Sequence, residues 1–175
     1  MTFHDQTMDI LNLQFIGAWN ENQQMIFKLG VEEFGIEVLE VQEVVRFVRP
    51  VKVPKAPECV YGVINFRGDI IPVLNLRRIF GLVPAEPDEF TVIIIVKTDE
   101  KTFGMVVDQV SDIINIPEVN IQPSEFSSKE KTKYLKAMGK MTNRLVLMLD
   151  LDKVVDFEKI EVALQPSFTK TEPVD

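Results

Sequence analysis

The sequence contains a single cysteine, Cys59, and a single histidine, His4. One cysteine cannot build a disulfide framework or a cysteine-based metal cluster. With its only imidazole beside the first residue, the chain offers no core histidine to activate a serine or cysteine nucleophile. The phosphate-cradling loops G-x-x-x-x-G-K-[ST] and G-x-G-x-x-G are also missing. We therefore expect no catalytic residues, no cofactor and no metal.

Long apolar runs and an early basic segment are missing as well. The longest apolar run covers residues 92–96, far short of the roughly 18 residues that a membrane-spanning helix needs. The first basic residue is Lys28, whereas a secretory signal peptide begins with positive charge. Together with the single cysteine, these features predict a cytoplasmic protein.

The net charge of −8 comes mostly from the two ends of the chain. Residues 1–23 carry three acids and no base, and residues 156–175 carry five acids and two lysines. An acidic chain without a basic stripe is a poor ligand for nucleic acid or for an anionic membrane surface. We expect a tail over residues 1–21, a folded domain over 22–158 and a second tail over 159–175.

Short apolar runs rich in β-branched residues alternate with turn signals, which is typical of a small barrel or sandwich. The strands predicted from these runs cover residues 24–29, 34–36, 60–66, 69–75, 90–97, 102–106 and 145–149.

Two segments of the chain recur in the same order. Residues 34–45 align without a gap with residues 103–114, at an offset of 69, and residues 70–80 align with 145–155, at an offset of 75. Each copy predicts a strand, a glycine kink, an acidic helical turn, a strand and a short amphipathic helix. Two copies of about 65 residues, divided near 82–88, have thin cores and should pack together, with a groove for a partner between them.

The tripeptide Arg67-Gly68-Asp69 predicts the turn of a β-hairpin, because Gly68 tolerates the positive φ that a tight turn requires. Asn65 and Gly68 should fix the backbone around Arg67, whose guanidinium can meet a carboxylate. Pro72 cannot donate a ladder hydrogen bond, so its strand should be an edge or bulged there.

Two acidic groups deserve comparison with catalytic or metal sites. Asp150 with Asp152 lacks the spacing of a calcium loop and predicts a helix N-cap instead. Glu37, Glu40 and Glu43 have helical spacing and predict one acidic face. Paired carboxylates can perform acid/base chemistry, but a solvated face is the more common role of such a group.

The segment 54–76, with Gly62-Val63-Ile64-Asn65-Phe66-Arg67-Gly68 and a following Pro72-Val73, resembles the signature of the CheW family of bacterial chemotaxis coupling proteins. Phe66 replaces the usual leucine and Asn75 the usual aspartate. Matches at 34–36, 41–43, 103–108 and 145–151 extend the resemblance over about residues 22–158.

This resemblance implies an all-β CheW-like fold of two five-stranded, SH3-like barrels packed side by side with short helices. It implies a scaffold rather than an enzyme, which couples the cytoplasmic tips of methyl-accepting chemotaxis receptors to the regulatory domain of the histidine kinase CheA. Kinase contacts are expected at apolar patches on the barrel ends, with no residue assigned. The receptor contact, carried over by position, comprises Val41, Glu43, Gly62, Asn65, Arg67 and Gly68.

The residue types suggest that Glu43 and Arg67 pair beside the groove and orient the guanidinium for a receptor. The aligned positions in the second copy are Asp112 and Thr142, so we expect the pair to be lost there and the contact to belong to the first barrel alone.

Three alternatives stay open from the sequence. The chain could serve an array that controls pilus-based motility or another output. It could be a CheW-like domain of CheA or of CheV, although Met1, the acidic tails and the missing linker favour a stand-alone protein. It could also be a small carboxylate-based enzyme.

Overall fold

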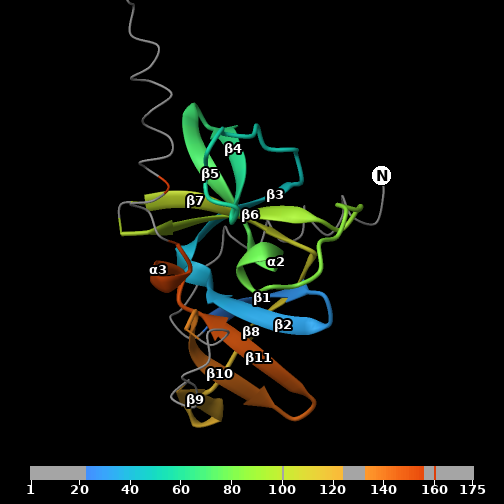
Figure 1. Ribbon diagram of the computed structural model, residues 1–175. Coiled ribbons are helices and arrows are strands. Elements are labelled where there is room, and N and C mark those ends of the chain that lie inside the picture. Colours follow the sequence, from blue (N-terminus) through green and yellow to red (C-terminus); the bar gives the residue numbers. More distant parts are fainter. Residues whose placement is uncertain (1–22, 100, 124–132, 156–159, 161–175) are drawn as a thin grey trace, which may run out of the picture.

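The computed structural model describes residues 23–99, 101–123, 133–155 and 160 (Figure 1). Within these ranges the strands are β1 (Gln23–Leu29), β2 (Glu32–Glu37), β3 (Val41–Arg46), β4 (Val60–Phe66), β5 (Asp69–Asn75), β6 (Val92–Thr98), β7 (Lys101–Val107), β8 (Gln109–Asn115), β9 (Ile121–Pro123), β10 (Leu135–Met141) and β11 (Arg144–Leu149). The helices are η1 (Val38–Glu40), α2 (Leu76–Ile79), η2 (Glu118–Asn120) and α3 (Leu151–Val154). The predicted tails lie outside the described residues, apart from Ile160. No described helix is long and apolar enough to span a membrane.

All seven predicted strands are present, with ends that differ by a residue or two. The predicted acidic helical turn is confirmed in the first copy only over the three residues of η1, which include Glu40, and the residues that follow form β3. In the second copy the prediction is wrong, because the corresponding segment forms β8. In β3, Val41 and Val44 are buried while Gln42 is exposed. A register shift between Val41 and Glu43 interrupts the alternation of buried and exposed residues in β3. The three-residue spacing of the acids is therefore the same as in a helix, although the segment is a strand.

The two sequence copies exchange strand pairs. One sheet, called sheet A here, has six strands in the order β8-β1-β2-β11-β10-β9, and sheet B has five in the order β3-β6-β7-β5-β4. The first two strands of the chain thus complete the sheet of the second copy, and β6 and β7 complete that of the first (Figure 1). Neither copy builds a sheet from its own strands alone. The domain limits and the boundary near 82–88 stay predictions.

The registers of the two sheets repeat the offsets found in the sequence. Ile26 lies opposite Gly35 in sheet A, and Ile95 lies opposite Gly104 in sheet B, each 69 residues later. The one parallel pairing in each sheet, β2 with β11 and β7 with β5, is likewise equivalent. A Cβ added to Gly104 would lie 2.8 Å from a methyl carbon of Ile93, so the paired strands need glycine here.

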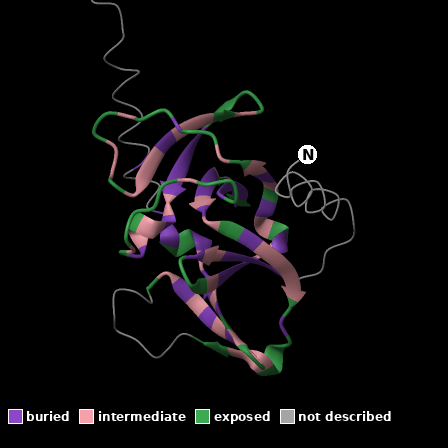
Figure 2. Cartoon of the chain, turned by 90° about the vertical axis from the view of Figure 1, so that its right-hand side faces the viewer, coloured by how far each residue is buried: buried purple, intermediate pink, exposed green. Residues whose placement is uncertain are grey.

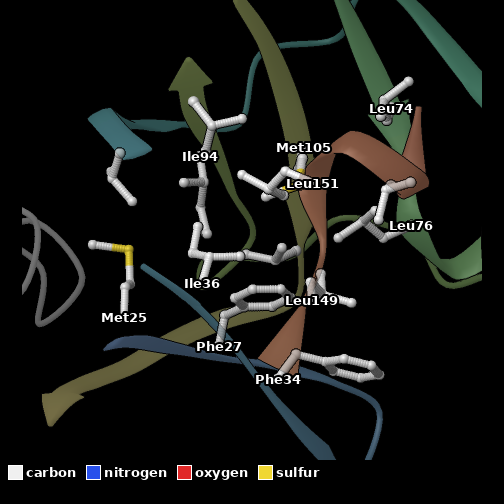
Figure 3. Packing of buried hydrophobic residues seen from close by; sticks show 14 of the residues in the cluster. Met25, Phe27, Phe34, Ile36, Leu74, Leu76, Ile94, Met105, Leu149 and Leu151 are labelled. Atoms are coloured by element: carbon white, nitrogen blue, oxygen red, sulfur yellow. The ribbon is translucent and has the colours of Figure 1, made fainter. Parts of the chain in front are cut away.

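The hydrophobic core has three parts. A central cluster lies between the sheets and draws equivalent residues from both copies, such as Ile36 with Met105 and Leu76 with Leu151 (Figure 3). Each sheet has a smaller cluster of its own. Ile26, Ile116, Val146 and Met148 belong to the one in sheet A, and their counterparts in sheet B are Ile95, Phe47, Ile71 and Val73. Buried residues accordingly run through the middle of the molecule, and exposed ones gather at turns and loops (Figure 2).

Closed five-stranded barrels are not confirmed, because no continuous ladder joins the edges of either sheet in the described residues. In sheet B a single bridge, Val51 to Val63, connects the chain after β3 to the opposite edge, β4. Pro72 is not on an edge strand, since β5 lies between β4 and β7. The ladder with β7 covers only Val73 to Asn75, however, so Pro72 lies beyond it.

Candidate functional site

The hairpin of β4 and β5 has the predicted two-residue turn. Phe66 pairs with Asp69, and Arg67 and Gly68 between them have φ values of 52° and 89°. The side-chain oxygen of Asn65 accepts a hydrogen bond of 2.9 Å from the amide of Gly68. This bond fixes the turn from within, so the exposed Arg67 side chain projects from an ordered backbone.

Glu43 meets this hairpin from the other edge of the same sheet. The Nη2 atom of Arg67 donates a hydrogen bond of 2.9 Å to Oε2 of Glu43. Because β3 and β4 are the two edges of sheet B, the ion pair links strands that share no continuous ladder. The guanidinium carbon also lies 5.1 Å from the ring centroid of Phe66. The predicted pairing of Glu43 with Arg67 is therefore confirmed.

Four of the six residues carried over from the resemblance come together here: Glu43, Asn65, Arg67 and Gly68. The other two are buried. Val41 belongs to the central cluster with 9% exposure. Gly62 has a φ of 154°, and a Cβ there would lie 2.4 Å from the carbonyl oxygen of Val51. We infer that these two residues pack beneath the exposed side chains and do not form part of the surface around Arg67.

The expected loss of the ion pair in the second copy is wrong. Arg144 donates two hydrogen bonds of 2.9 Å to Asp112 and two more, of 2.9 and 3.0 Å, to Glu33. The arginine lies two positions beyond Thr142, at the first residue of β11, and so a position-by-position alignment misses it. Its two carboxylate partners raise the pKa of Arg144.

A further ion pair, which the sequence reasoning did not find, joins the two sheets. Arg77 of α2 donates two hydrogen bonds to Asp108, one of 2.9 Å from Nε, and a third to the carbonyl of Val83. Asp108 also accepts a bond of 2.7 Å from the amide of Gly30. Burial alone raises the pKa of Asp108, but the bonds from Arg77 and Gly30 outweigh it and hold the pKa below its ordinary value.

The three acids predicted to share one face have different surroundings. Glu43 pairs with Arg67, and Glu37 binds Lys136 at 2.6 Å. Glu40 lies in η1, where burial and then the neighbouring charge of Glu37 raise its pKa to about 7. The other predicted acidic group has its expected role, because Asp150 caps α3 by accepting a bond of 3.1 Å from the amide of Asp152.

A cavity of about 400 Å³ lies beside Arg77 and Asp108, with Tyr61, Arg49 and Glu86 on its walls. Its lining mixes cations and carboxylates. Within the described residues, no group of three or more histidine, cysteine, aspartate or glutamate side chains is placed to hold a metal ion.

The fold and the hairpin together define a two-sheet domain that exposes an arginine held by an ion pair. A family model described as the CheW-like domain matches residues 23–159. The chain belongs to the CheW family.

Several known proteins are similar over most of the chain. The chemotaxis protein CheW of Klebsiella aerogenes is 34% identical over 148 residues, which cover 84% of this chain and 88% of that protein. The chemotaxis protein CheW of Helicobacter pylori is 29% identical, with coverage of 82% and 81%. The crystal structure of the scaffolding protein TtCheW from Thermoanaerobacter tengcongensis superposes with a TM-score of 0.70 at 30% identity, covering 75% of this chain and 90% of that one.

Proposed function

We propose that this protein is a chemotaxis scaffold that binds the tips of methyl-accepting receptors and the regulatory domain of the histidine kinase CheA in the cytoplasm. Membership of the CheW family supports this proposal, as do relatives named for chemotaxis and a structural neighbour described as a scaffold. Those names favour chemotaxis over the pilus-motility alternative. The protein acts by forming complexes and regulates kinase activity without chemistry of its own.

The observation that carries the receptor proposal is the ion pair of Glu43 with Arg67. The Arg67 side chain is 73% exposed. Glu43 is 29% exposed and accepts a hydrogen bond from one guanidinium nitrogen of Arg67. The remaining guanidinium donors are oriented outward for a carboxylate or a carbonyl group of a receptor helix. The hydrogen bond between Asn65 and Gly68 fixes the turn. Val41 in β3 and Gly62 in β4 are buried, and their packing fixes the two strands that carry Glu43 and Arg67.

The test is a pull-down of the full chain with a receptor tip and with a CheA regulatory domain, separately and together. We expect each to bind, and we expect Arg67→Ala to weaken only receptor binding. Arg78→Ala is a matched control, because Arg78 is also an exposed arginine paired with a carboxylate, that of Glu58. If neither partner binds the unmodified chain, the scaffold assignment is wrong.

A loss of receptor binding that is equal for Arg67→Ala and Arg78→Ala would reject the assignment of the site while leaving the scaffold assignment in place. A conservative Arg67→Lys variant separates charge from geometry. Lysine keeps the charge but lacks the planar fork, so we expect it to restore only part of the binding.

A further inference from the structure

The side chain of Arg67 contacts an aromatic ring as well as the carboxylate of Glu43. Its guanidinium carbon lies over the ring of Phe66, the preceding residue, at 5.1 Å from the ring centroid. The face of an aromatic ring is electronegative and attracts a guanidinium group. Leucine, the usual residue of the family signature at this position, has no such face. The contact is therefore a feature of this sequence rather than of the signature.

The Phe66 ring is itself held in place. Phe66 is the last residue of β4, pairs with Asp69 across the turn, and packs against the small apolar cluster of sheet B. The backbone beside the ring is fixed by the hydrogen bond from the amide of Gly68 to the side chain of Asn65. The ring therefore offers a fixed surface against which the guanidinium packs.

The carboxylate and the ring restrain the guanidinium in different ways. Glu43 accepts a hydrogen bond from one guanidinium nitrogen of Arg67 and so uses one of the five N–H donors of an arginine. Phe66 covers a face of the group and uses no donor. Within the part of the chain that the structure describes, four donors are left for a partner. The ring also limits the rotation of a long side chain, whose ordering otherwise opposes binding.

Arg144 of the second copy is held differently. Its hydrogen bonds to Glu33 and Asp112 use four of its five donors. Met141 is the counterpart of Phe66, since each is the last residue of its strand and pairs with the first residue of the next strand. An arginine fixed by carboxylates alone has few donors to offer, whereas an arginine fixed by one carboxylate and one ring keeps most of them.

We propose that Phe66 is a positioning residue for Arg67, which orders the guanidinium before the receptor binds and leaves its donors available to that partner. The inference rests on the proposed receptor contact of Arg67 and adds a requirement to it. The contact depends on the ring that precedes the arginine as well as on the ion pair with Glu43. A chain without the ring keeps every charge of the site, but its arginine must be ordered during binding.

The variant Phe66→Leu tests the proposal in the full chain, and it should fold because leucine is the usual residue of the signature. We expect its affinity for a labelled receptor tip to be about twofold to fivefold lower, the range of an exposed cation–π contact. Phe66→Tyr keeps the ring face and should bind as the unmodified chain does.

Phe47→Leu is the matched control. Phe47 also packs against the small cluster of sheet B, and an exposed arginine, Arg49, lies over its ring at 5.8 Å from the centroid. The control therefore removes a ring of the same kind without touching Arg67, and it should leave receptor affinity unchanged.

A double-mutant cycle separates positioning from a structural role. In an Arg67→Ala background, Phe66→Leu should have no further effect on receptor binding, because no guanidinium is left to position. A second readout needs no partner. In NMR spectra of the free chain, the ring current should shift the Cδ protons of Arg67 upfield in the unmodified chain and in Phe66→Tyr, but not in Phe66→Leu.

Unchanged affinity of Phe66→Leu overturns the proposal, and so does an equal loss in Phe47→Leu or an equal loss with and without Arg67. If the unmodified chain does not bind the receptor tip at all, the proposed function fails, while the NMR shifts still decide whether the ring positions Arg67. Absence of the upfield shift in the unmodified chain overturns the positioning role by itself.

Discussion

Asp112 occupies in sheet A the place that Glu43 occupies in sheet B. Asp112 lies opposite Ile26 and Glu43 lies opposite Ile95, in registers that differ by 69 residues for both members. Each carboxylate binds an arginine from the hairpin of its own sheet. The arginines differ in exposure, since 73% of the Arg67 side chain is exposed and only 30% of Arg144. Both copies keep an ion pair, but only the first presents its guanidinium to solvent.

Exchanging the two charges, by Glu43→Arg with Arg67→Glu, tests the first pair. Each single change should lower receptor affinity, and the double variant should regain part of the loss in a double-mutant cycle. The free energy of unfolding should change by no more than about 1 kcal/mol, because the pair is exposed. If neither single change weakens receptor binding in the pull-down, the pair has no part in that contact.

Arg144→Ala tests the second pair. The change leaves Glu33 and Asp112 facing each other without their shared cation, so we expect a loss of about 2 kcal/mol in the free energy of unfolding. Urea unfolding monitored by circular dichroism measures it. Thr142→Ala is the control, because Thr142 is exposed in the turn before Arg144 and should be neutral within about 0.5 kcal/mol. Equal effects of the two changes would contradict the role given to Arg144.

Gly62→Ala should be strongly destabilising. The added methyl group would lie 2.4 Å from a backbone oxygen, which cannot move aside as a flexible side chain could. We expect a loss of at least about 3 kcal/mol in the free energy of unfolding. Gly30→Ala is the matched control, with a φ of 64° and nothing within 4 Å of the new carbon, and should cost only about 1 kcal/mol. A similar loss for both would show that φ alone matters at Gly62.

Glu40 makes stability depend on pH near neutrality. Its pKa is raised to about 7 in the folded protein, by burial first and then by Glu37, Asp150 and Asp152 against the opposing effect of Lys136. The folded state thus binds a proton that the unfolded state has released, and stability falls as the pH rises from about 5 to 8.

Glu40→Gln should remove this dependence and stabilise the protein at pH 8 by about 1–2 kcal/mol, less than the full shift because solvent screens the group. Urea unfolding at pH 5.5 and pH 8 measures it. Glu118→Gln, at an exposed position of η2, is the control and should leave the pH profile unchanged. An identical profile for Glu40→Gln and the unmodified chain would contradict the assignment.

Asp108→Asn tests the link between the sheets. The pKa of Asp108 is below its ordinary value, so its contribution to stability is present above the unfolded pKa, near 4, and is lost as the pH falls through the folded value. The substitution should lower the free energy of unfolding by about 1–2 kcal/mol at pH 7, and by much less at pH 2. A loss that does not shrink in acid would mean that the side chain acts through packing instead.

Much of the fold follows from local patterns in the sequence. The seven predicted strands, the Arg67-Gly68 turn and the cap at Asp150 depend on residues close together in the chain, where β-branched runs and turn residues decide the conformation. β3 and β8 were not predicted as strands because each contains a register shift, beside Glu43 in β3 and between Val110 and Asp112 in β8, that breaks the alternation of buried and exposed residues. β10 contains lysines and a glycine among its apolar residues and has no clear period.

The exchange of strand pairs could not be read from the sequence, because the two copies offer equivalent edges. Ile26 opposite Gly35 and Ile95 opposite Gly104 have the same pairing chemistry, so local patterns do not state which sheet each hairpin joins. The ion pair of Glu43 with Arg67 was predictable, because the two residues have opposite charges and Arg67 lies in a hairpin turn that the sequence itself predicts. It was not predictable for Arg144, whose partners lie 111 and 32 residues away in the chain.

The exchange of strands also sets an order for folding on the ribosome. The hairpin of β1 and β2 is synthesised first, yet the strands on either side of it are β8 and β11, so its edges find no partner in sheet A until the second half of the chain has emerged. Sheet B, in contrast, is complete once β7 has been made. Contacts this distant in sequence slow folding and leave strand edges open to other chains in the meantime. Among the described residues, β11 is the last strand to be synthesised, and its pairing with β2 completes the contacts of the first hairpin in sheet A.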